Sequence, residues 1–125
     1  MTTTIVVCDT CRYSEEEKLF DGKTGGEILC EHVEHLAQGK PDLAVRRRSC
    51  LMGCTRHCNV AIIAERKLTY VLGEFQPDTD AAQALVDYAA LHAQSENGQV
   101  PFRQWPQGVK GHFVARIPPL DVDVP

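Results

Sequence analysis

Short apolar runs alternate with amphipathic segments along the first half of the chain. Residues 4–7 are β-branched or apolar without a break, which predicts a short buried strand. Between residues 27 and 38, apolar side chains recur at helical spacing and share one face: Leu29, Val33 and Leu36. Residues 43–47 predict a second strand, and a single helical turn is expected at residues 15–17, before the helix.

The second half of the chain predicts a hairpin and a second helix. Residues 59–65 and 68–75 each have strand character, and the polar turn between them suggests that they pair antiparallel. The turn at residues 77–80 carries a helix cap, and the apolar positions after it form one stripe: Ala82, Leu85, Val86 and Ala89. From residue 99 onward the pattern weakens, and we expect an extended tail.

This order of elements predicts an α/β fold. A strand, a crossover helix and a strand form a right-handed parallel unit. The hairpin and the last helix then complete a four-stranded mixed sheet with helices packed against it, which is the layout of a thioredoxin-like fold. We expect one domain at residues 1–98 and an extended C-terminal tail, packed on that domain, at residues 99–125.

Composition and charge narrow the class of protein. The chain has 125 residues, 43% of them hydrophobic, which suits one domain with one core. It has no apolar run of membrane-spanning length and no signal-peptide pattern at its start, so we expect no membrane partner and a cytoplasmic location. The net charge of -4 argues against nucleic acid as a partner, and the short basic run at residues 46–48 is typical of a solvated strand face or edge.

Five of the six cysteines form two groups, and each group follows a predicted strand. Cys8 and Cys11 come after the first strand, and three more come after the second: Cys50, Cys54 and Cys58. The C-terminal ends of neighbouring parallel strands meet at one edge of a sheet, where open α/β sheets place their sites. We therefore expect these thiols to converge. In a reducing cytosol, clustered thiols indicate metal binding or catalysis more often than structural disulfides.

Spacing alone leaves three kinds of chemistry open. Four thiolates hold a [2Fe-2S] cluster, two on each iron. Four thiolates also hold Zn²⁺ in a tetrahedron. A Cys-x-x-Cys pair after a strand is typical of a thiol–disulfide couple, but such enzymes usually place a cis-proline just before the third strand, where this chain has residues 57–59, His-Cys-Asn.

The second cysteine group resembles the second ligand loop of thioredoxin-like [2Fe-2S] ferredoxins. The resemblance lies in residues 50–54, Cys-Leu-Met-Gly-Cys, and continues through the strand at 59–63, the strand at 68–73 and the helix at 78–91. The chain most closely resembles a branch of small predicted metal-binding proteins that are often encoded near cobalamin-biosynthesis genes. Two parts of the tail look like that branch: residues 100–103 and 115–119.

The resemblance implies a cofactor and a set of ligands. It implies one [2Fe-2S] cluster, with Zn²⁺ as the alternative, held by four thiolates: Cys8, Cys11, Cys50 and Cys54. The family usually carries Gly-Pro before the third strand, where this chain has His57 and Cys58. Cys58 is therefore an alternative ligand, and His57 is a further candidate.

The resemblance also implies a function. The chain would transfer single electrons, or sense through its cluster, in service of a larger redox or metal-handling protein; service to cobalamin assembly is one such hypothesis. It would have no substrate of its own, so we do not expect an enzyme. A zinc or cobalt carrier and a thiol–disulfide oxidoreductase are the alternatives, and since family members often dimerise, a homodimer is one expectation.

Three further residues of the first predicted helix carry reactive side chains. Cys30 is expected to be a small buried hydrophobe, as lone helical cysteines usually are. His32 and His35 lie three residues apart among glutamates, which is typical of surface histidines. A second, weaker metal site is the alternative interpretation of this pair.

Overall fold

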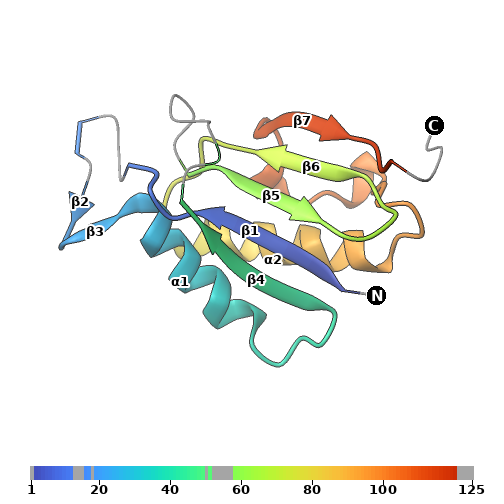
Figure 1. Ribbon diagram of the computed structural model, residues 1–125, viewed down its shortest axis with the longest axis horizontal. Helices are drawn as coiled ribbons and strands as arrows, with labels where there is room; N and C mark the ends of the chain where they lie inside the picture. The colour runs from blue at the N-terminus through green and yellow to red at the C-terminus, as the bar shows by residue number, and fades with distance from the viewer. Residues whose placement is uncertain (1, 13–15, 18, 50, 52–57, 121–125) are drawn as a thin grey trace.

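The structure is a computed structural model that describes residues 2–12, 16–17, 19–49, 51 and 58–120. Five strands form one mixed sheet in the order β4-β1-β5-β6-β7 (Figure 1). β1 (Thr3–Cys8) runs parallel to the edge strand β4 (Leu43–Arg48) and antiparallel to β5 (Val60–Ile63). β6 (Thr69–Leu72) pairs antiparallel with β5, and β7 (Phe113–Ile117) pairs antiparallel with β6.

Two helices pack side by side on one face of this sheet. α1 (Gly25–Ala37) forms the crossover between β1 and β4, and α2 (Thr79–Gln94) follows the β5–β6 hairpin (Figure 1). Both helices begin where the sequence supplies a cap. The Thr24 hydroxyl accepts from the backbone N–H of Glu27 at 3.1 Å, and Asp78 Oδ1 accepts from the backbone N–H of Ala81 at 2.9 Å. The predicted α/β class is confirmed.

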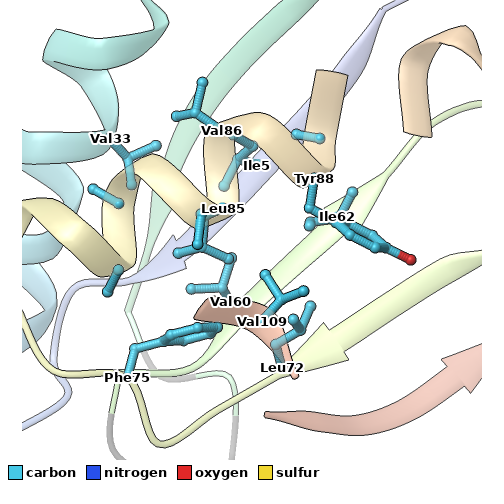
Figure 2. Packing of buried hydrophobic residues seen from close by; sticks show 14 of the residues in the cluster. Ile5, Val33, Val60, Ile62, Leu72, Phe75, Leu85, Val86, Tyr88 and Val109 are labelled. Carbon is cyan, nitrogen blue, oxygen red and sulfur yellow. The ribbon is translucent and has the colours of Figure 1, made fainter. Parts of the chain in front are cut away.

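The core lies between the sheet and the two helices. Because strand side chains alternate, every second residue of β1 and β5 faces the helices and is fully buried: Ile5, Val7, Val60 and Ile62. Figure 2 shows Leu85 and Val86 of α2 among these strand side chains, with Phe75 and Val109 closing the far end of the same cluster. This packing holds β1 in place, and Cys8 is the last residue of β1.

The sheet has one strand more than the four predicted from sequence. Residues 113–117 of the C-terminal segment form β7 and pair with the free edge of β6. Two short 3₁₀ helices precede β7, η1 (Phe102–Gln104) and η2 (Gln107–Val109), and Val109 is fully buried in the core. The strand was missed because only its first residue is half-buried, so it lacks the alternation that marks a strand in sequence.

The segment before α1 also differs from the prediction. The helical turn expected at residues 15–17 is not helical at Glu16 and Glu17, and residues 14–15 fall outside the described part of the chain. Instead, β2 (Leu19–Phe20) and β3 (Lys23–Thr24) form a small hairpin. Asp21 and Gly22 both have positive φ, 53° and 81°, as a two-residue hairpin turn of this twist requires.

No helix in the described ranges has the length and apolar character that crossing a membrane requires.

Candidate metal centre

The candidate centre lies at the C-terminal end of β1, between β4 and β5. Cys8, the last residue of β1, is the register partner of Arg48, the last residue of β4. The backbone N–H of Asp9 donates to the Arg48 carbonyl at 3.0 Å, and that of Cys8 donates to the Asn59 carbonyl at 3.0 Å. Residues 49–58 connect Arg48 to Asn59, so Ser49 and Cys58, at the two ends of this segment, both lie at this edge of the sheet.

Four hydrogen bonds converge on the Cys8 sulfur. The Thr10 hydroxyl lies 3.5 Å from it, and the Cys11 thiol and the backbone N–H groups of Thr10 and Leu51 also donate to it. Leu51 follows Cys50 in the sequence, and its N–H lies at the Cys8 sulfur. Burial raises the pKa of the Cys8 thiol, but these hydrogen bonds outweigh burial and leave its pKa below the usual value.

The Cys11 sulfur lies beside Cys8 and faces the start of β5. The backbone N–H of Asn59 donates to Cys11 Sγ at 3.4 Å, and the side-chain amide of Asn59 does so at 3.7 Å. Burial is the largest influence on Cys11 and, with the neighbouring Cys8, raises the pKa of this thiol to about 11. One thiol of the pair thus favours the thiolate and the other favours the protonated form.

Cys58 completes a group of three thiols. Its side chain is fully buried, and its Sγ lies 4.0 Å from the Arg12 carbonyl oxygen. Burial, followed by the charges of Cys11 and Cys8, raises the pKa of Cys58 to about 12. The backbone at Cys58 has a φ of 58°, in the left-handed region that non-glycine residues seldom occupy. Strain of this kind is concentrated at functional sites.

The N-terminus of α1 supports the first cysteine pair from the other side. The backbone N–H of Gly26 donates to the Cys11 carbonyl at 3.1 Å. A Cβ atom at Gly26 would lie 1.8 Å from the Cys8 carbonyl oxygen and 2.9 Å from the Asp9 Cα. Only glycine allows the helix to approach the strand end this closely, so the position of Cys8 and Cys11 depends on Gly26.

The structure brings together three of the ligand candidates that the sequence indicates. Cys8, Cys11 and Cys58 lie at one place, whereas Cys50, Cys54 and His57 are outside the described residues. Cys30 lies elsewhere, fully buried in α1, as expected from sequence. Within the described ranges no group of three or more His, Cys, Asp or Glu side chains is arranged to hold a metal ion. Cys8, Cys11 and Cys58 therefore do not by themselves form a metal site, and His32 and His35 form none with described neighbours.

The groups around the thiols suit a metal or an iron–sulfur cluster held by thiolates. The sulfur atoms are soft donors, and backbone and side-chain N–H groups point at two of them, as is usual for metal-bound cysteine. Asp9 Oδ1 is buried beside Cys8 and has no hydrogen-bond partner among the described groups. An unsatisfied buried carboxylate oxygen is unfavourable in a finished core and indicates a region that is incomplete by itself.

Sequence reasoning did not identify Asn59, Thr10 or the Leu51 N–H as part of the site. Asn59 was predicted only as the first residue of a strand, yet it is 3% exposed and both of its N–H groups face Cys11. A polar residue directly before an otherwise apolar strand was the available signal, because a buried amide needs partners.

One hollow in the described surface lies away from the cysteines. It has a volume of about 740 Å³ and lies between β7 and the segment after α2, where Tyr70, Trp105 and Phe113 line it. A second hollow, of about 520 Å³, borders the cysteine site and includes Leu51.

Comparison with known proteins agrees with this architecture. One solved structure matches the chain: a thioredoxin-like [2Fe-2S] ferredoxin from Aquifex aeolicus, with a TM-score of 0.56, 11% sequence identity and coverage of 98% of each chain. The fold is therefore thioredoxin-like, as the order of elements predicts. The chain itself belongs to the family described as "Protein of unknown function (DUF1636)", which matches residues 5–119. No curated protein matches it.

Proposed function

We propose that this protein carries one [2Fe-2S] cluster and exchanges single electrons with a partner protein. The proposed ligands are four thiolates, with Cys58 as the alternative to one of them: Cys8, Cys11, Cys50 and Cys54. The observation that carries the proposal is the hydrogen bond from the Leu51 N–H to the Cys8 thiol. This hydrogen bond places Leu51, which follows Cys50 in the sequence, beside Cys8. The thioredoxin-like ferredoxin that shares the fold supports the choice of cluster.

The residues around the thiols would tune such a centre. When bound, the cluster supplies the one-electron chemistry. Asn59, Thr10 and Leu51 donate hydrogen bonds to the Cys11 and Cys8 sulfurs. Donors of this kind stabilise negative charge on sulfur, so they favour the thiolate form for binding and would raise the reduction potential. The burial of all three described thiols excludes water from them.

The partner proposed from the resemblance is an enzyme of cobalamin assembly that takes up electrons for cobalt reduction. This hypothesis rests on the similarity of residues 100–103 and 115–119 to the proteins encoded near cobalamin-biosynthesis genes. A cytoplasmic location and the absence of a substrate of its own belong to the same proposal.

A thiol–disulfide oxidoreductase is the second candidate, because one observation favours it. The lowered pKa of Cys8 beside the raised pKa of Cys11 is the pattern of an attacking thiol and its resolving partner. Accessibility argues against this candidate: Cys8 is only 3% exposed and Cys11 6%. A disulfide substrate needs access to the attacking sulfur, whereas a buried metal ligand does not.

Anaerobic purification followed by iron, acid-labile sulfide and zinc analysis tests the proposal. We expect about two iron and two sulfide per chain, with visible absorption that bleaches on addition of dithionite. About one zinc per chain, no sulfide and no colour would identify the zinc alternative instead. A metal-free protein that reduces disulfides, and stops doing so as Cys8→Ser, would identify the oxidoreductase.

Cysteine variants locate the ligands. Cys8→Ser and Cys50→Ser should each lose most of the iron, since each removes one proposed ligand. Cys30→Ser is the matched control: Cys30 is also fully buried, but it lies within α1 away from the site. It should keep the full iron content. Equal iron in all three variants would contradict the ligand assignment.

A further inference from the structure

Among the described residues, one face of the sheet carries no helix, because α1 and α2 both pack on the other face (Figure 1). The helix-covered face presents Ile5 and Val7, so the alternate side chains of the same strands point the other way. These side chains form the floor of the groove of about 520 Å³, with Val6, Ala61 and Ile63 as its apolar part. Ile63, the last residue of β5, is 40% exposed and is the most exposed apolar side chain of the groove.

The charged residues of this groove are all positive. Arg46 and Arg48 line it, and none of its described lining residues is acidic. Neither arginine takes part in the ion pairs of the described residues. Arg47 lies between them and faces the helix side, where it pairs with Glu34 of α1 at 2.9 Å. Arg47 of the basic run therefore lies on the helix side of the sheet, whereas Arg46 and Arg48 lie together in the groove. The groove is positive although the net charge of the protein is -4.

The groove also reaches the cysteine site. Arg48 is the register partner of Cys8, and register partners on parallel strands present their side chains to the same face. Leu51 lines the groove, and its backbone N–H donates to the Cys8 sulfur. Leu51 thus belongs to both the groove and the surroundings of the Cys8 sulfur.

We propose that this groove is the docking surface for an acidic partner protein that exchanges one electron with the centre at Cys8. This inference rests on the proposed function. Carboxylates on the partner pair with Arg46 and Arg48, and an apolar group on it packs against the exposed Ile63, since Val6 and Ala61 are each only 8% exposed. Opposite charges steer the encounter and orient the partner, and small interfaces suit transient redox complexes. One electron passes from the reduced centre to an oxidised one-electron acceptor, and no atom is transferred.

Binding is the first test, because it does not depend on the cluster. The affinity of the full-length protein for oxidised flavodoxin, an acidic one-electron carrier, is measured by calorimetry at low ionic strength. We expect Arg46→Gln/Arg48→Gln to bind about 10-fold more weakly, and the wild-type affinity to fall as salt is added, since salt screens exposed charges. Arg47→Gln is the matched control, with one positive charge removed on the opposite face. It should bind as wild type does.

Electron transfer is the second test. The reduced protein is mixed with two cobalt(III) oxidants of opposite charge, tris(oxalato)cobaltate(III) and hexaamminecobalt(III), each of which accepts one electron to give cobalt(II). We expect the double variant to react about 5-fold more slowly with the anion and no more slowly with the cation. Circular dichroism checks that each variant is folded.

The outcomes separate this inference from the proposed function. If flavodoxin does not bind, or if Arg47→Gln weakens binding as much as the double variant, the docking surface is wrong even where the cluster is present. If the protein holds no cluster but flavodoxin binding still depends on Arg46 and Arg48, the docking surface is supported and the proposed electron-transfer role is wrong. A homodimer in sedimentation that dissociates in the double variant, or tighter binding of an oligonucleotide than of flavodoxin at the same arginines, would also overturn the proposal.

Discussion

The two ends of β1 bury polar groups in opposite ways. At the N-terminal end, the Thr3 hydroxyl lies 2.9 Å from His92 Nδ1, and His92 Nε2 lies 2.7 Å from the Leu68 carbonyl oxygen. Lys67 is 3% exposed, and its ammonium donates to the His92 and Ala93 carbonyls at the end of α2, at 3.0 and 2.8 Å. At this end each of these buried polar side chains has partners supplied by the chain itself.

At the C-terminal end of β1, the buried groups are thiols and a carboxylate oxygen that lacks a hydrogen-bond partner among the described groups. Cys8, Cys11 and Cys58 are weak hydrogen-bonding groups, and the thiol pKa values of Cys11 and Cys58 are raised by burial. Asp9 Oδ1 has no hydrogen-bond partner among the described groups. The comparison suggests that the His92 end holds the fold together, whereas the cysteine end is arranged to hold something else. Variants at each end test this contrast.

The largest effect is expected at Gly26. In Gly26→Ala the new Cβ would overlap the Cys8 carbonyl oxygen, so either α1 or the end of β1 must move. We expect the free energy of unfolding in urea to fall by about 3 kcal/mol or more, because backbone has little room to shift in a packed region. Gly39→Ala is the control: φ is +78° there, but nothing lies within 4 Å of its Cβ, so a loss of about 1 kcal/mol is expected. Equal losses would show that the close approach is unimportant.

The next largest effect is expected at the His92 end. Lys67→Met keeps the apolar part of the side chain but removes both hydrogen bonds to the last turn of α2. We expect a loss of about 2 kcal/mol in thermal or urea unfolding, with the iron content unchanged. Lys40→Met, at an exposed site after α1, should change stability by less than about 0.5 kcal/mol. If Lys67→Met lost iron without losing stability, the two ends would not have separate roles.

The smallest effect is a pH dependence that His92 imposes. Burial, together with the charge of Lys67, lowers the pKa of His92, although its bond to the Leu68 carbonyl opposes this. Below pH about 6.5 the unfolded chain therefore binds a proton that the folded chain resists, so stability falls as the pH drops through that value. We expect a slope of up to about 1.4 kcal/mol per pH unit. His92→Gln should flatten this slope in urea titrations at pH 5 to 8. An unchanged slope in His92→Gln would assign the effect to other groups.

Most of the fold was predictable because its signals are local. Strand β1 was predicted at residues 4–7 and found at 3–8, and the capped helix expected after residues 77–80 begins at Thr79. β7 was not predictable, because its stability comes from pairing with β6 rather than from its own pattern. The β2–β3 hairpin was missed for a related reason: each strand has two residues, too few for a periodicity.

The candidate site was predictable in part. The rule that parallel strand ends meet at one edge predicts that the two cysteine groups converge, and Cys58, the described member of the second group, lies with Cys8 and Cys11. The separate roles of Arg46, Arg47 and Arg48 were not predicted, since alternation assigns faces only once the position of the helices is known.

The sequence by itself determined the order of four of the strands and of the two α-helices, the start of both helices and the grouping of the cysteines, because these depend on neighbours a few residues apart. Only the tertiary structure decided which thiol sits among hydrogen-bond donors, why Gly26 must be glycine and which arginines line the groove beside the cysteine site. Those properties depend on distances between segments that are far apart along the chain. They are fixed by how the sheet and helices pack, and no local pattern encodes them.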